Sequence, residues 1–430
     1  MAVIVGAASQ PLQPADSPPG PSAEAGSSLE GQSVPGRIGA PIATGLDPAG
    51  SDAPLVALLV PLSGRQQALG MAIRDGFIAA HLEAPASRRF NTLIIDEARV
   101  GAAEAHAQAL NAGARALVGP LLKDSVQALA PLVGHLAGPL SGQLPVLALN
   151  NLADTDPGSG GLWQFGLAPE DEAREIAARA SALGQLRAVV LIPASEWGQR
   201  LLAAFTAEFT LQGGVVVDAR TYLPGATDFT VPIRSLLLTT DTTPAPPPGA
   251  ATNPGENPSL APGRRQDVDL ILVAANSSNG RQIVPQLKFF GAGDLPIYST
   301  SAIWEDGGAA DDDLNGVVFP DSPWIIAPDG RQLAVKNGLV RHWGRAALSV
   351  SRLYALGYDA YQLLPDILHQ AAPGPFEAGE IPGATGVLYA DTAGRIHRRL
   401  SFAEIRGGRP IPLPAKLPIP LPAPLPPAGT

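Results

Sequence analysis

The strongest constraint on the fold is a regular alternation of apolar strands and amphipathic helices. Residues 55–60, LVALLV, form a continuous apolar run, as expected for a strand that is covered on both faces. The stretch that follows places Leu69, Ala72, Ile73, Phe77 and Ala80 on one face of a helix. The further runs that we predict as strands are 92–96, 116–119, 144–149, 187–192, 215–223 and 267–275. Alternation with short connections predicts a parallel, doubly wound α/β sheet.

The same pattern starts again after Trp163, where Pro169 opens a helix with three acids in its first turn. Helical patterns separate the predicted strands at 102–112, 124–135, 198–211, 228–238 and 278–290, and another covers 348–364. Two successive α/β units of similar size indicate two lobes. A chain that passes between two lobes more than once makes a hinged pair with a cleft between them.

Three stretches rich in proline interrupt this pattern. Residues 1–53 are predicted to be a disordered tether, and residues 413–430 a disordered tail that favours polyproline II. Residues 239–266 read as a surface-loop insertion, either passive or a docking segment. Residues 1–9 resemble the end of an export signal. Two explanations stay open: a start codon set downstream of the true signal, or a plain disordered N-terminus.

Composition excludes several classes of function. Charged residues make up 16% of the chain and the net charge is −10, which argues against a nucleic-acid partner. The chain has no cysteine, so disulfides, thiolate nucleophiles, Cys-based metal sites and thioether lipidation of this sequence are excluded. No run approaches the roughly 20 apolar residues that a membrane-spanning helix needs.

Catalytic signatures are missing from the sequence. It has no Walker-type phosphate loop, no Gly-x-Gly-x-x-Gly and no Gly-x-Ser-x-Gly elbow. The six histidines include no i, i+4 pair, and the acids at 311–313 lack the glycine and the distal glutamate of a calcium loop. We therefore expect no catalytic residues, no metal and no cofactor. A hydrolase would need a nucleophile beside a base, and no such pair can be named.

Polar residues follow three of the predicted strands, at the edge where a doubly wound fold places ligands. Ser63 and Gly64 either hold a carboxylate or make the turn. Asp124 and Ser125, next to Lys123, either face the cleft or cap the following helix. The amides of Asn150 and Asn151 either face the cleft or cap the strand. The candidate cleft residues are Ser63, Gly64, Lys123, Asp124, Ser125, Asn150 and Asn151.

The ordered part of the chain resembles a known family. Residues 56–64, VALLVPLSG, followed by 72–77, AIRDGF, resemble the opening of the C-terminal domain of bacterial penicillin-binding protein activators. Further resemblance lies, in order, in VGPL at 118–121, PVLALN at 145–150, FGLAPEDEA at 165–173, LYALGYDA at 353–360, GATG at 383–386 and RRL at 398–400. The resemblance covers about residues 56–412.

This resemblance implies a bilobal, type I periplasmic-binding-protein-like fold. The first lobe would take residues 54–166 and 293–370, and the second 167–292 and 371–412. It also implies a periplasmic protein at the outer membrane that stimulates a class A penicillin-binding protein, the bifunctional peptidoglycan synthase, by protein–protein contact. The sequence departs from the family in two ways. Long members carry an N-terminal helical-repeat domain, whereas residues 1–53 here are rich in proline and glycine. Long members also carry a lipid-modified cysteine, and this sequence has no cysteine.

The same fold allows a second function, a solute-binding protein for an amino acid or a similar small ligand. That protein would use Ser63, Ser125 and Asn150 in the cleft and would close its lobes on binding. The loops offer few charged partners for a zwitterion, Lys123 and Asp124 being the obvious pair.

Overall fold

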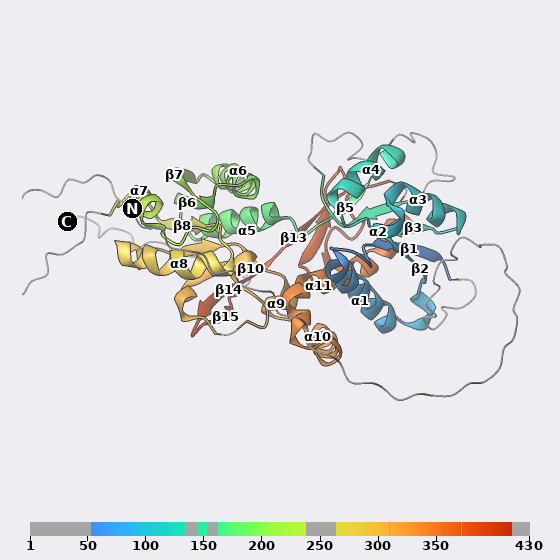
Figure 1. Cartoon of the computed structure of the whole chain (residues 1–430). Helices are drawn as coiled ribbons and strands as arrows, with labels where there is room; N and C mark the ends of the chain where they lie inside the picture. The colour runs from blue at the N-terminus through green and yellow to red at the C-terminus, as the bar shows by residue number, and fades with distance from the viewer. Residues whose placement is uncertain are drawn as a thin grey trace, which may run out of the picture. The chain divides into compact units, whose positions relative to one another are not determined.

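The apolar runs form two separate β-sheets in the computed structural model, as the repeated α/β pattern predicts (Figure 1). The structure describes residues 53–134, 144–152, 162–237, 264–308, 310–370 and 372–414. All of these residues lie in one compact unit, Pro41–Thr430.

The first sheet has eight strands in the order β11-β12-β13-β5-β4-β3-β1-β2. The strands from β13 to β2 pair in parallel, whereas β11, β12 and β13 pair antiparallel. Their bounds are β1 (Leu55–Val60), β2 (Asn91–Asp96), β3 (Ala116–Val118), β4 (Val146–Ala148), β5 (Trp163–Phe165), β11 (Ile381–Pro382), β12 (Val387–Ala390) and β13 (Arg395–Arg399).

The second sheet has seven strands in the order β15-β14-β10-β9-β8-β6-β7. It is parallel from β10 to β7, and β14 and β15 extend it antiparallel. Their bounds are β6 (Arg187–Pro193), β7 (Val215–Tyr222), β8 (Leu270–Val273), β9 (Ile297–Ser299), β10 (Val317–Asp321), β14 (Ser401–Arg406) and β15 (Arg409–Pro412).

Helices cover the sheets. In the first half of the chain they are α1 (Gln67–Glu83), α2 (Glu97–Val100), α3 (Ala102–Asn111), α4 (Lys123–Gly134), α5 (Pro169–Ala182) and α6 (Glu196–Leu211). In the second half they are α7 (Thr230–Leu237), α8 (Ser277–Leu287), α9 (Pro323–Ile326), α10 (Gly330–Trp343), α11 (Ser351–Gln362) and α12 (Leu364–His369).

Each sheet has a hydrophobic core on both faces, which explains why a strand such as β1 is apolar at every position. In β1, Val56, Leu58 and Val60 belong to one core and Ala57 and Leu59 to another. The same alternation divides β6 between the two cores of the second sheet. Because successive side chains of a strand point to opposite faces, a strand between two layers of helices must be apolar throughout.

Helices α1 and α11 lie side by side in contact, through glycines (Figure 1). The apolar face predicted for α1 is confirmed, since Ala72, Ile73 and Phe77 are buried. A Cβ atom on Gly76 would lie 2.0 Å from the carbonyl oxygen of Tyr354, and one on Gly357 would lie 2.0 Å from that of Ile73. The two backbones therefore touch, and a side chain at either glycine has no room.

The chain passes between the sheets at places that differ from the predicted lobe boundaries. Strands β9 and β10, predicted within the first lobe as part of 293–370, pair in the second sheet. Strands β11 to β13, predicted within the second lobe as part of 371–412, pair in the first sheet, where β13 lies beside β5. The chain thus crosses after β5, after β10 and after β13. A short apolar strand carries no local signal for which of two sheets it joins.

Other predictions fall outside the described residues. The tether 1–53, the insertion 239–266 and the tail 413–430 lie almost wholly in parts of the chain that the structure does not describe. Within the described ranges, no helix has the length and apolar character needed to cross a membrane.

Candidate functional site

The loop after β1 already holds a carboxylate, and it comes from the protein itself. The Leu62 N–H donates to Asp96 Oδ1 at 2.8 Å, and the Ser63 hydroxyl also bonds Asp96. Burial alone would raise the pKa of Asp96, but these bonds and one from the Ala98 N–H outweigh it and lower the pKa. Gly64 has φ +73°, which suits the turn that follows.

The loop after β3 is closed in the same way by Glu97, the first residue of α2. Glu97 accepts the N–H groups of Leu121 and Leu122 at 3.1 and 3.2 Å, together with the Ser125 hydroxyl. Burial raises the pKa of Glu97 even though these bonds oppose it. Because α4 begins at Lys123, Asp124 and Ser125 lie inside its first turn and not at its cap.

In the loop after β4, some side-chain hydrogen-bonding groups are paired within the protein and others face a cavity. The side-chain amide of Asn150 donates to the Leu121 carbonyl at 2.9 Å, and its oxygen accepts the Asn151 N–H. Lys123, Asn150 and Asn151 together line a cavity of about 360 Å³. The side-chain oxygen of Asn151 is buried there without a hydrogen-bond partner in the structure. Of the seven predicted cleft residues, these three share one cavity.

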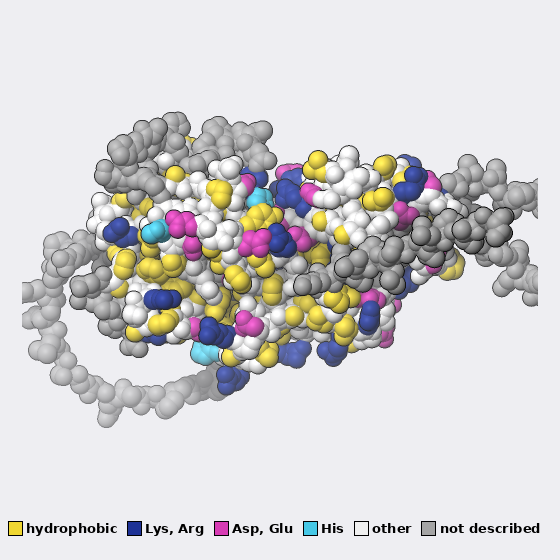
Figure 2. All heavy atoms as spheres, turned by 180° about the vertical axis from the view of Figure 1, so that it is seen from behind, with side chains coloured by type: hydrophobic (Ala, Val, Ile, Leu, Met, Phe, Trp, Pro, Cys, Tyr) yellow, Lys and Arg dark blue, Asp and Glu magenta, His cyan; other side chains and the backbone are white. Residues whose placement is uncertain are grey.

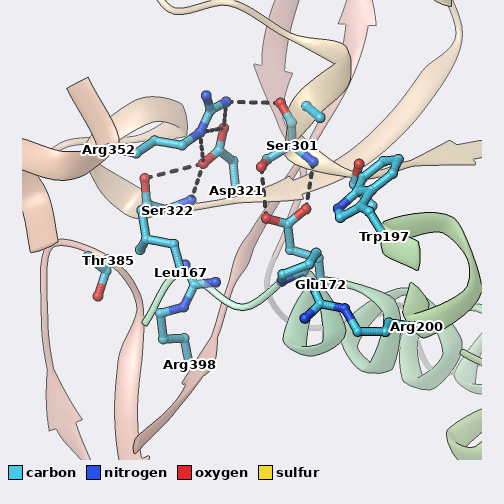
Figure 3. A pocket seen from close by; sticks show the side chains of 13 residues that line it. Leu167, Glu172, Trp197, Arg200, Ser301, Asp321, Ser322, Arg352, Thr385 and Arg398 are labelled. Carbon is cyan, nitrogen blue, oxygen red and sulfur yellow. Dashed lines mark hydrogen bonds and ion pairs between the residues drawn. The ribbon is translucent and has the colours of Figure 1, made fainter. Parts of the chain in front are cut away.

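A second cavity, of about 340 Å³, lies where the chain crosses between the sheets (Figure 3). Glu172, on the first turn of α5, accepts both the N–H and the hydroxyl of Ser301 at 2.8 Å. Burial raises the pKa of Glu172 to about 7, against the opposing influence of the Arg398 charge and of the two Ser301 bonds. From the sequence, Glu172 is predicted only as an acid that suits the helix dipole, since no local pattern reveals its partner 129 residues away.

On the other side of this cavity, Arg352 of α11 is bonded to the second sheet (Figure 3). Its guanidinium forms an ion pair with Asp321, at the end of β10, at 2.5 Å. It also donates to the carbonyl oxygens of Ser301 and Trp304 at 3.0 and 3.1 Å. The Asp321 side chain is 3% exposed, so Arg352 is the cation that balances a buried charge.

The crossing from β5 to α5 is tied to β13 by a third set of charges. Asp171 pairs with His397 at 3.0 Å and lies 3.8 Å from Arg398. His397 also contacts Asp391 at 3.3 Å, so carboxylates occupy both of its ring nitrogens. The hydrogen bond to Asp171 raises the pKa of His397, although burial acts in the opposite direction. A histidine engaged in this way is not free to activate a nucleophile.

Two segments of the resemblance meet beside this cluster. Asp359 of α11 is fully buried and accepts the N–H groups of Ala384 and Thr385 at 2.7 Å and the Thr385 hydroxyl at 2.6 Å. A Cβ on Gly383 would lie 2.6 Å from Asp359 Oδ2, so glycine is needed there for the carboxylate to approach. Burial raises the pKa of Asp359 to about 6.

The cluster around the second cavity consists largely of charges that are paired with one another. Its acids are bonded to arginines, hydroxyls or backbone N–H groups, and the described residues offer no group of three or more His, Asp or Glu side chains that could hold a metal ion. What this arrangement can do is hold the three crossings in one geometry.

The stability of the protein should depend on pH through Glu172. Its folded pKa lies above its unfolded value of 4.5, so the folded state holds the proton more tightly, and stability falls as pH rises from about 4.5 to 7. We expect Glu172→Gln to remove this loss, so that urea unfolding at pH 5 and pH 8 differs less than in the wild type. The matched control, Glu104→Gln at an exposed position on α3, should keep the wild-type pH dependence. Identical pH profiles for Glu172→Gln and the wild type would contradict this assignment.

Comparison with known proteins identifies the family. Residues 51–408 match the family described as "LppC putative lipoprotein". The chain belongs to the LppC family. The resemblance seen in the sequence is thereby confirmed.

Relatives of the LppC chain carry a consistent name. A "Penicillin-binding protein activator LpoA" of Vibrio antiquarius is 29% identical over 359 residues, covering 81% of this chain and 56% of the relative. A protein of the same name from Dickeya chrysanthemi is 27% identical, covering 88% of this chain and 63% of the relative. The LppC chain therefore spans little more than half of the length of these relatives.

Solved structures confirm the predicted fold. The C-domain of LpoA from Haemophilus influenzae, described as a regulator of PBP1A, superposes on the LppC chain with a TM-score of 0.63 at 24% identity. The match covers 84% of this chain and 99% of that one. A structure from Rhodospirillum rubrum described as "a putative branched-chain amino acid ABC transporter" gives a TM-score of 0.61 at 17% identity, covering 84% of this chain and 100% of that one. Two lobes of the periplasmic-binding type are thus shared with both.

Proposed function

We propose that this chain is a non-catalytic envelope protein that binds and stimulates a class A penicillin-binding protein, and so regulates peptidoglycan synthesis. The observation that carries the proposal is the family match over residues 51–408, with relatives named as activators of penicillin-binding proteins. The family description as lipoprotein supports a place in the periplasm at the outer membrane.

The hydrogen bonds within the cleft support a function in protein binding rather than in the turnover of a small molecule. Asp96 and Glu97 occupy the hydrogen-bond donors of two loops that would otherwise receive a ligand carboxylate. The buried acids beside the crossings are paired with arginine or with hydroxyl and N–H donors. A protein contact on the outer surface needs none of these groups to be free.

The test is reconstitution with a class A synthase from the same organism. We expect this chain to raise the rate of glycan polymerisation, of peptide cross-linking, or of both, measured on lipid II with and without the protein. Serum albumin at the same concentration controls for non-specific effects. Unchanged rates of both reactions, with a folded protein, would rule the proposal out.

One observation favours a second candidate, a solute-binding function. The cavity with Lys123 and Asn151 contains an unbonded amide oxygen beside an exposed lysine. A thermal-shift screen with amino acids and other small carboxylates would detect such a ligand, because binding at a hundredfold excess over the dissociation constant adds about 2.7 kcal/mol to stability. A shift that Lys123→Met abolishes would favour this candidate. A screen without shifts would count against it.

A further inference from the structure

The segment around α10 differs in charge from the rest of the protein. Between Asp329 and Asp359 the chain has five of its 29 Lys and Arg residues and none of its 39 Asp and Glu residues. The protein as a whole carries a net charge of −10. Figure 2 shows dark-blue basic side chains at several places along the lower edge of the molecule, which includes the part where α10 lies in Figure 1.

Two of these cations form ion pairs within the protein, which explain their presence. Lys336 pairs with Asp306 at 2.8 Å, and Arg352 pairs with Asp321 at 2.5 Å. The remaining three, Arg331, Arg341 and Arg345, are exposed, as is His342. Arg345 makes one bond, to the Gly307 carbonyl at 2.8 Å, which leaves most of its guanidinium donors to solvent or to a partner.

Helix electrostatics account for only part of this pattern. Cations in the last turn of a helix are favourable, which is a sufficient reason for Arg341 and His342. Arg331, however, lies in the first turn, where a positive charge is unfavourable. Trp343 ends the helix with 44% of its surface exposed, which the helix dipole does not explain either.

Helix α10, which presents Arg331, Arg341, His342 and Trp343, is firmly anchored. Asp329 and Gln332 form a capping box at its start, with the Asp329 carboxylate accepting the Arg331 and Gln332 N–H groups at 2.8 Å. Val335 and Leu339 pack against the core of the first lobe. A surface held in this way loses little conformational entropy on binding. Tryptophan and arginine are also the residues that most often dominate the energy of protein interfaces.

We propose that the α10 surface, made of Arg331, Arg341, His342, Trp343 and Arg345, is a docking site for an acidic patch on a partner protein. Exposed cations on an acidic protein attract an anionic face and orient it, so charge complementarity favours this partner. Trp343 supplies the apolar anchor within the cluster. The proposal rests on the proposed function in taking the peptidoglycan synthase as that partner.

The experiment measures binding of the whole chain to the class A synthase, together with stimulation of its activity. We expect Arg341→Glu with Trp343→Ala to weaken binding at least tenfold without changing the thermal unfolding midpoint. Wild-type affinity should also fall as salt rises from 50 to 300 mM, since exposed charges are then screened. Arg115→Glu, a reversal at an exposed arginine between α3 and β3, should leave binding within twofold.

The outcomes separate this inference from the function on which it rests. If the wild-type chain neither binds nor stimulates the synthase, the proposed function fails and this assignment of the partner fails with it. If the wild type binds and the double variant binds equally well, the α10 surface is not the docking site, whereas the function stands. The double variant is also tested for binding to anionic vesicles, to isolated peptidoglycan and to a second copy of the chain. If it loses one of these interactions but still binds the synthase as the wild type does, the proposal is overturned.

Discussion

Replacing Gly76 by alanine is expected to lower the free energy of unfolding by roughly 3 kcal/mol, because a single methyl group has no space at the contact between α1 and α11. The added Cβ would lie 2.0 Å from the backbone oxygen of Tyr354. A backbone atom cannot rotate away as a side chain can, so the helices must separate and the buried side chains of Ile73 and Phe77 lose contacts. Urea unfolding followed by circular dichroism measures the change.

The same chain offers a control of opposite sign. Gly338 lies inside α10, and a Cβ there meets no atom within 4 Å. We expect Gly338→Ala to stabilise the protein by about 0.5–1 kcal/mol, since alanine costs less conformational entropy in a helix than glycine does. Equal effects of the two substitutions would mean that the close packing at Gly76 is not what requires glycine.

Replacing Arg352 by alanine is expected to cost about 3–5 kcal/mol, since it leaves the carboxylate of Asp321 buried without a counter-charge. The loss also removes the bonds from Arg352 of α11 to the carbonyls of Ser301 and Trp304, which lie in the turn that follows β9 of the second sheet. Chemical unfolding at pH 7 measures the total change.

Two further variants separate the buried charge from the side chain itself. The double substitution Asp321→Asn with Arg352→Met removes both charges at similar volume and should be less destabilised than Arg352→Ala. Arg406→Ala removes an exposed partner of Glu404 and should leave the unfolding midpoint unchanged. A double variant as unstable as the single one would show that packing, rather than an unpaired charge, explains the loss.

Much of the fold follows from local pattern. The apolar run of β1 and the face of α1 with Ile73 and Phe77 are set by period and burial, so the sequence predicts them. Sheet membership is a different matter. Whether β9 joins β8 or a strand of the first sheet depends on long-range pairing. The three residues of β9 are equally suited to a strand in either sheet, so they give no local signal.

The candidate site shows the same division. The sequence places Ser63, Ser125 and Asn150 in the segments that follow strands. The structure has Ser63 and Asn150 in such loops and Ser125 in the first turn of α4, but their partners lie elsewhere in the chain. Asp96 and Glu97 look locally like a strand end and a helix start. Their role depends on how β1, β2 and β3 are ordered in the sheet, which periodicity does not encode. A role for the seven residues in ligand binding stays a prediction.

The occupation of the β1 and β3 loops by Asp96 and Glu97 has a consequence for physiology under the proposed function. A protein that senses a free ligand changes its population of states when that ligand binds or leaves. Here the carboxylates of Asp96 and Glu97 are part of the chain itself, so each of the two loops always has one carboxylate beside it. The effect of the protein on cell-wall growth would then depend on how much of it is made and where it is placed, and not on a ligand anion at these two loops.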